Sequence, residues 1–178
     1  MTTADRFEVF VRRYQDMVFG TALRLLGNPT EAEDVAQTVF LRAFERFAAI
    51  GESPSAAGWL KTVTTNACLN HLSRYRARWR LFSELARNDG TGAFEETLVA
   101  DTGAEGALEN RERDARVERA LRALPNHQRV PLALFHFEDL SYQDIATLLG
   151  VSLGKVKTDI HRGRETLRRQ LRPDDDAS

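Results

Sequence analysis

The chain has 178 residues, of which 42% are hydrophobic and 29% are charged, and its formal net charge is -1 at pH 7. This length supports one moderate core or two small ones, and the single cysteine excludes an internal disulfide. The four histidines have no Cys/His spacing suited to zinc, and no stretch resembles a signal peptide or a membrane span. We therefore expect a cytoplasmic protein with no membrane insertion, no cofactor and no bound metal.

The small net charge hides an uneven distribution. Residues 61–80 carry five bases and no acid, residues 83–118 carry ten acids against four bases, and residues 119–172 carry ten bases against five acids. Phosphate binding needs a local excess of Lys and Arg rather than a positive total, so the two basic regions are candidates for contact with nucleic acid. Solvated helix faces give similar blocks of charge. Only the placement of the charges on the helices can distinguish a face that binds nucleic acid from one that is merely solvated.

The first third of the chain predicts three helices. Apolar residues recur every three or four positions over residues 7–26, and Gly27-Asn28-Pro29 ends that helix. Thr30 and Glu33 predict a capping box at the start of the second helix. The expected core face of this helix consists of Ala32, Val35, Ala36, Val39, Phe40, Ala43, Phe44 and Phe47.

A third apolar stripe follows the loop over residues 51–55 and runs to Trp79. We expect these three helices to form one domain over residues 1–82. Between residues 83 and 110 the periodicity fades, and glycines and acids predict a flexible acidic linker. The acidic residues of 83–118 are also expected to fold over the basic faces of the free chain.

The second expected domain covers residues 111–178. Pro125 should end a helix that contains Val117 and Leu124, and Pro131 should kink or delay a short apolar helix over residues 132–137. No segment shows the sustained alternation of a β-strand. The predicted fold class is all-α, with two small helical domains joined by the linker and a helix-turn-helix in the C-terminal one.

The helix-turn-helix is predicted over residues 141–172. Ser141 with Asp144 can cap one helix, Gly150 supplies a sharp turn, and Ser152 can cap a longer second helix. Long donors and short hydrogen-bonding groups gather on the exposed face of that second helix, as reading of the major groove requires. These candidate residues are Ser152, Lys155, Lys157, Thr158, His161, Arg162 and Arg164. An ordinary αα-hairpin with a basic face is the alternative.

Two further helix faces are candidate binding surfaces. On the second helix, residues spaced i, i+3, i+4 and i+7 lie opposite the core stripe and can dock a partly basic helical partner: Asp34, Gln37, Thr38 and Leu41. The third helix carries an uncharged polar stripe that can hydrogen-bond bases while basic side chains hold phosphates: Trp59, Lys61, Thr62, Thr65, Asn66, Asn70, Arg74 and Arg76. Solvated faces can show both patterns, and Trp59 and Cys68 also suit a role in the core.

Together these motifs resemble the extracytoplasmic-function (ECF) sigma factors. Residues 154–157 and 161–164 are similar to the promoter-reading C-terminal domain of that family, and residues 28–43 to its polymerase-binding helix. Trp59-Leu60 and Asn66 resemble its promoter-melting helix. The resemblance implies a subunit that directs core RNA polymerase to promoters. Its implied contacts are the β′ clamp coiled-coil, the β flap, the minus-ten and minus-thirty-five elements of promoter DNA, and an anti-sigma factor.

Two other function classes remain open from the residues alone. One is a helix-turn-helix transcriptional regulator that acts without docking on polymerase, and the other is a helical adaptor whose basic faces bind an acidic protein. An enzyme is not expected, since the sequence shows no nucleophile paired with a base, no phosphate-binding glycine loop and no set of metal ligands. No catalytic residue is therefore assigned.

Overall fold

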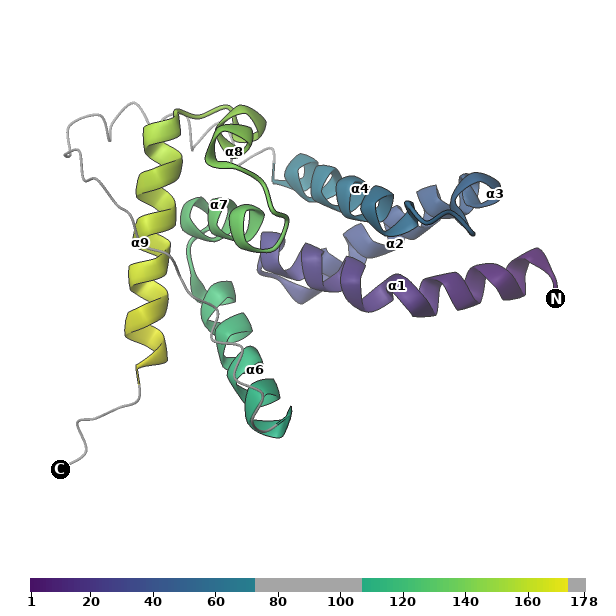
Figure 1. Cartoon of the computed structure of the whole chain (residues 1–178), viewed down its shortest axis with the longest axis horizontal. Helices are drawn as coiled ribbons and strands as arrows, with labels where there is room; N and C mark the ends of the chain where they lie inside the picture. The colour runs from purple at the N-terminus through teal and green to yellow at the C-terminus, as the bar shows by residue number, and fades with distance from the viewer. Residues whose placement is uncertain (73–106, 173–178) are drawn as a thin grey trace.

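The computed structural model describes residues 1–72 and 107–172, and all regular structure within these two ranges is helical (Figure 1). The all-α prediction is confirmed for this part of the chain. The predicted linker over 83–110 lies outside the described residues except for its last four, which belong to α6. The described helices are α1 (Thr3–Leu26), α2 (Pro29–Glu45), α3 (Phe47–Ile50), α4 (Ala56–His71), α6 (Ala107–Ala123), α7 (Asn126–His136), α8 (Tyr142–Leu149) and α9 (Leu153–Leu171).

The turn between α1 and α2 follows the predicted sequence signals with one difference. Gly27 adopts the left-handed conformation, with φ of 69°, and its N–H donates to the carbonyl of Leu23, so α1 ends where expected. Helix α2 begins with Pro29, and the side chain of Asn28 accepts hydrogen bonds from the N–H groups of Thr30 and Glu31 at 2.9 and 3.2 Å. The predicted capping role of Thr30 is therefore wrong. Asn28 is the better cap because proline occupies the first helical position after it.

Helices α1, α2 and α4 pack against one another and form the N-terminal core. Each contributes the apolar side of an amphipathic helix, as the periodicity predicts. The largest fully buried side chains there are Val18, Leu25, Val39, Leu60, Leu69 and Leu72. At the far end of α1, Phe7 and Phe10 contact Phe47 edge-on, with ring centroids 5.2 and 5.5 Å apart.

Helices α7, α8 and α9 form the helix-turn-helix domain, and α6 packs against α9. Ser141 and Asp144 make the predicted capping box, Gly150 is left-handed with φ of 67°, and the hydroxyl of Ser152 accepts from the N–H of Lys155 at 3.1 Å. Helix α7 begins at Asn126, earlier than the predicted helix over 132–137, and Pro131 lies inside it. Helix α7 packs against both α9 and the C-terminal end of α1 (Figure 1).

Candidate functional site

The predicted docking face lies on α2, on the side opposite its buried residues. Asp34, Gln37, Thr38 and Leu41 are all exposed, and the exposed fraction of Leu41 is 68%. The hydroxyl of Thr38 donates to the carbonyl of Asp34 at 3.1 Å. The structure thus brings these four side chains together as one surface, called here the docking strip.

A groove of about 700 Å³ between α1 and α2 extends the docking strip. Gln37 and Leu41 line it together with the aromatic rings of Phe19, Phe40 and Phe44. The sequence pattern assigned Phe44 to the core, but 53% of its surface is exposed. Phe44 follows buried Ala43 on the helix, and periodicity alone did not separate these neighbouring positions. The surface next to the docking strip is therefore more apolar than the sequence predicted.

The groove also carries negative charge. Asp16 from α1 and Glu33 from α2 line it, and Asp34 lies beside Glu33 on the exposed side of α2. An apolar groove bordered by carboxylates suits an amphipathic helix with basic residues along its edge. This arrangement matches the partner chemistry predicted for the docking strip.

The predicted nucleic-acid stripe lies on α4. Thr62, Asn66 and Asn70 are exposed at successive i, i+4 positions and form one polar row. Thr65 is only 8% exposed, so little of it is accessible to DNA, and Trp59 is half-buried and packs against the core. Arg74 and Arg76 lie outside the described residues. We refer to Thr62, Asn66 and Asn70 as the α4 stripe.

Two side chains of α4, Lys61 and Cys68, interact electrostatically with Glu138 of the C-terminal domain. Burial raises the pKa of the Glu138 carboxyl, while the nearby positive charge of Lys61 opposes that rise. Burial, reinforced by the charge of Glu138, raises the pKa of the Cys68 thiol to about 12. A thiol that stays protonated and fully buried is unreactive, so Cys68 fills space in the core.

The predicted recognition helix is α9. Val156, Ile160 and Gly163 face the interior, and a Cβ on Gly163 would lie 3.4 Å from a methyl carbon of Leu132 on α7. This distance is ordinary van der Waals contact, and it places α9 against α7 at this point. The N-terminal half of α9 carries the residues predicted to read DNA.

The basic residues of α9 differ in how accessible they are. Lys157 and Arg162 are exposed. The Lys155 ammonium instead lies 2.7 Å from the carboxylate of Asp159, in a pair whose side chains are 10% and 8% exposed. Burial raises the pKa of Asp159, and its hydrogen bond with Lys155 opposes that rise. Lys155 is thus paired with an acid of its own domain. The i, i+4 spacing of Lys155 and Asp159 is visible in the sequence, but a count of the charges in this region does not reveal the pair.

The other candidate DNA-binding residues of α9 are partly buried or contact neighbouring groups of the chain. Thr158 is half-buried, and the ring Nε2 of His161 lies 3.3 Å from the carboxylate of Glu165. The guanidinium of Arg164 lies 5.5 Å from the ring centre of Phe135 and hydrogen-bonds the ring Nε2 of His136 at 3.2 and 3.3 Å. Ser152 is exposed while it caps the helix. The sequence pattern did not single out Arg169 and Arg172 as DNA-binding candidates, although both are basic and exposed near the end of α9.

Among the residues that the structure describes, no group of His, Cys, Asp and Glu side chains is placed to hold a metal ion. Within residues 1–72 and 107–172, no helix combines the length and apolarity needed to cross a bilayer.

The fold and these surfaces define a helix-turn-helix protein with a second helical domain that carries a docking strip. Comparison with known families shows which helix-turn-helix proteins this chain resembles. The family described as Sigma-70 region 2 matches residues 10–79, and Sigma-70, region 4 matches residues 114–167.

Individual relatives agree with the family matches. The chain is 31% identical over 168 residues to ECF RNA polymerase sigma factor SigW of Bacillus subtilis, covering 94% of this chain and 90% of SigW. It is 34% identical over 165 residues to ECF RNA polymerase sigma factor SigE of Mycolicibacterium smegmatis, covering 93% of this chain and 61% of SigE. The chain belongs to the ECF RNA polymerase sigma factors.

Among solved structures, the chain matches the sigma factor RpoE of Bartonella quintana, crystallised in complex with the anti-sigma factor NepR. The match has a TM-score of 0.49 and 23% identity, and it covers 93% of this chain and 96% of that one. At this level of similarity, the family assignment rests on the sequence relatives alone.

The His136–Arg164 contact predicts a pH dependence of stability. Burial, and then the charge of Arg164, lower the pKa of His136 below its usual 6.5. The unfolded chain therefore takes up a proton before the folded chain does, and stability falls as the pH drops through about 6.5. Protonation also removes the acceptor that Arg164 uses.

We expect urea unfolding, followed by circular dichroism, to show a lower midpoint for the wild type at pH 5.5 than at pH 7.5. The His136→Gln variant keeps an acceptor that cannot titrate, so it should show a smaller loss. His127, whose pKa burial also lowers, is present in both proteins and cancels in the comparison. An equal loss in the two proteins would assign the effect to other groups.

Proposed function

We propose that this chain directs core RNA polymerase to specific promoters and thereby initiates transcription, without catalysing a covalent step itself. The observation that carries the proposal is the sigma-factor relationship over 94% of the chain. Family membership favours this function over a polymerase-independent regulator or an adaptor. Its place of action would be the cytoplasm, where polymerase and promoter DNA meet.

The division of labour that we propose follows the two domains. Residues 1–82 would dock on polymerase and capture the minus-ten element, residues 83–110 would link the domains, and residues 111–178 would bind the minus-thirty-five element. The apolar and acidic surroundings of the docking strip support contact with the β′ clamp coiled-coil. The C-terminal domain would also contact the β flap, and an anti-sigma factor would hold the chain inactive.

For the minus-ten element, the proposed contacts start from the α4 stripe. Thr62, Asn66 and Asn70 present hydroxyl and amide groups without charge, which suits hydrogen bonds to the edges of bases that have left the stack. Unstacking costs only a few kcal/mol per base, so capture of the exposed strand can drive local melting. Lys61, Arg74 and Arg76 would hold the phosphates.

For the minus-thirty-five element, we propose that the start of α9 enters the major groove. Lys157 and Arg162 are the accessible long donors there, and Ser152, Thr158, His161 and Arg164 lie on the same helix. Lys155 would bind DNA only by leaving Asp159, so we expect it to contribute less than Lys157.

The docking strip yields the first test of this function. The double variant Asp34→Arg with Gln37→Ala should weaken binding to purified core polymerase by at least about 30-fold, because hot-spot residues of an interface contribute about 2 kcal/mol or more. Binding can be measured by fluorescence anisotropy of the labelled chain. The Glu109→Arg variant makes the same charge change at an exposed site on α6 and should bind normally. Unchanged binding of the double variant would contradict polymerase docking through α2.

The recognition helix yields a second test. Lys157→Ala and Arg162→Ala should each weaken binding to a duplex that the wild-type chain selects from a random pool. A loss of about 1–3 kcal/mol is expected for a base contact, and a phosphate contact would instead reduce the salt dependence. Arg13→Ala removes an exposed cation from α1 and should have no effect. If both α9 variants bind like the wild type, α9 does not read the duplex.

A further inference from the structure

A charged pair is buried at the start of α9, beside the residues that would read DNA. The ammonium Nζ of Lys155 donates to the Oδ2 atom of Asp159 at 2.7 Å, and the two side chains are only 10% and 8% exposed. Ser152, Thr158 and Arg162 lie on the same part of the helix. Lysine side chains are strongly hydrated and are rarely this deeply buried without a paired acid. The position of the Lys155 ammonium is therefore determined by Asp159.

Asp159 depends in turn on Lys155. Among the residues that the structure describes, Asp159 is the only buried acid, with 6% of its surface exposed. Burial raises the pKa of its carboxyl, and Lys155 opposes that rise, followed by His127 of α7 and Arg162 of α9. Burial also lowers the pKa of His127 below 6.5, so this imidazole is largely neutral at pH 7. Lys155 is thus the main positive charge that stabilises the buried carboxylate.

The pair adds no net charge to the surface of α9. A lysine that neutralises a DNA phosphate releases counterions, and each such contact makes binding more dependent on salt. Lys155 cannot make this contact while its ammonium is bound to Asp159 and its side chain is nine-tenths buried. Lys157 and Arg162, by contrast, are exposed. The chain therefore has one more cation at the start of α9 than this surface presents.

The side chain of Lys155 can leave the pair without movement of the helix. Its backbone N–H is held by the hydroxyl of Ser152 at 3.1 Å, as part of the helix cap. The four-carbon stem is flexible, and the adjoining surface is open, because a Cβ at Gly154 would meet no atom within 4 Å. Loss of the negative charge of Asp159 would thus free the ammonium to extend into solvent.

We infer that Asp159 limits duplex binding by holding Lys155 away from the phosphates, and so sets the DNA affinity of α9 without touching DNA itself. Asp159 is a positioning residue in this role, since it acts only through Lys155. The role rests on the proposed function, because it needs α9 to bind duplex DNA. A duplex contact weakened in this way leaves tight promoter binding dependent on the other contacts of the proposed complex.

Lysine labelling tests the pair in the absence of DNA. The chain has three lysines, Lys61, Lys155 and Lys157, so an amine-reactive succinimidyl ester followed by mass spectrometry resolves each of them. Lys155 must break a charged hydrogen bond before it reacts, so in the wild type it should react about tenfold or more slowly than exposed Lys157. In Asp159→Asn the two rates should be similar. Equal rates in the wild type would overturn the inference.

Duplex binding tests the consequence, with a duplex that the wild-type chain selects from a random pool. Asp159→Asn should bind this duplex more tightly than the wild type does. The ratio of the two affinities should fall by about threefold as salt rises from about 50 to about 200 mM, because one added phosphate contact steepens the salt dependence by that amount. The bound duplex should protect Lys155 from labelling in Asp159→Asn and leave its rate unchanged in the wild type.

The Lys155→Gln background provides the matched control. A general loss of negative charge from α9 would give Asp159→Asn the same gain in affinity in both backgrounds, whereas release of Lys155 gives a gain only where Lys155 is present. Circular dichroism verifies that the wild type, the two single variants and the double variant are folded. If Lys155→Gln does not fold, protection of Lys155 by the duplex in Asp159→Asn makes the same distinction.

The outcomes distinguish this role of Asp159 from the proposed function. A wild type that binds a duplex, combined with no gain for Asp159→Asn or with the same gain in both backgrounds, would overturn the inference and leave the proposed function intact. A wild type that selects no duplex would contradict DNA reading by α9, and the inference with it. Labelling would still report whether Asp159 holds Lys155.

Discussion

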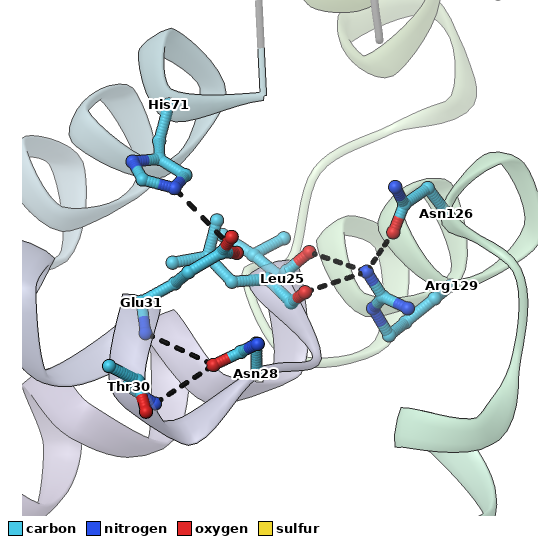
Figure 2. Close-up of polar contacts among 8 residues, drawn as sticks. Leu25, Asn28, Thr30, Glu31, His71, Asn126 and Arg129 are labelled. Carbon is cyan, nitrogen blue, oxygen red and sulfur yellow. Dashed lines mark hydrogen bonds and ion pairs between the residues drawn. The ribbon is translucent and has the colours of Figure 1, made fainter.

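The buried guanidinium of Arg129 on α7 donates hydrogen bonds to the terminal carbonyls of α1, at Leu25 and Leu26 (Figure 2), and the packing of α7 against α1 depends on this interaction. A buried charge is costly unless hydrogen bonds satisfy it, and here the acceptors come from both domains. The end of α1, the conformation of Gly27 and the position of α7 are therefore linked. Since α2 and α4 also pack on α1, this helix positions the docking strip, the α4 stripe and the helix-turn-helix relative to one another.

The surfaces that would act in transcription differ in their physical character. The docking strip combines acids with exposed apolar side chains, the α4 stripe is polar and uncharged, and the start of α9 presents basic donors. These differences suit a helical protein partner, unpaired bases and duplex phosphates respectively. A net charge of -1 is compatible with DNA binding because the basic groups are concentrated where the DNA would lie.

The sequence predicted those features that local chemistry determines. Helix ends at Gly27, Ser141, Gly150 and Ser152 are correct, because each depends on residues only a few positions apart. Errors arose where neighbouring residues compete, as with Asn28 and Thr30 for one cap, or with buried Ala43 and exposed Phe44 on one helix. The engagement of Lys155 by Asp159 was visible at i, i+4 spacing, but the burial of the pair was not. The contact of Arg129 with Leu25 and Leu26 joins residues more than a hundred positions apart, and no local pattern predicts it.

The most direct test of the central claim is run-off transcription with purified core RNA polymerase and a promoter library. A sigma factor should allow core polymerase to start transcripts at a defined subset of templates that share two sequence elements, and core polymerase alone should not do so. Failure to direct initiation from any template, with a folded chain that binds core polymerase, would contradict the function argued from the three surfaces.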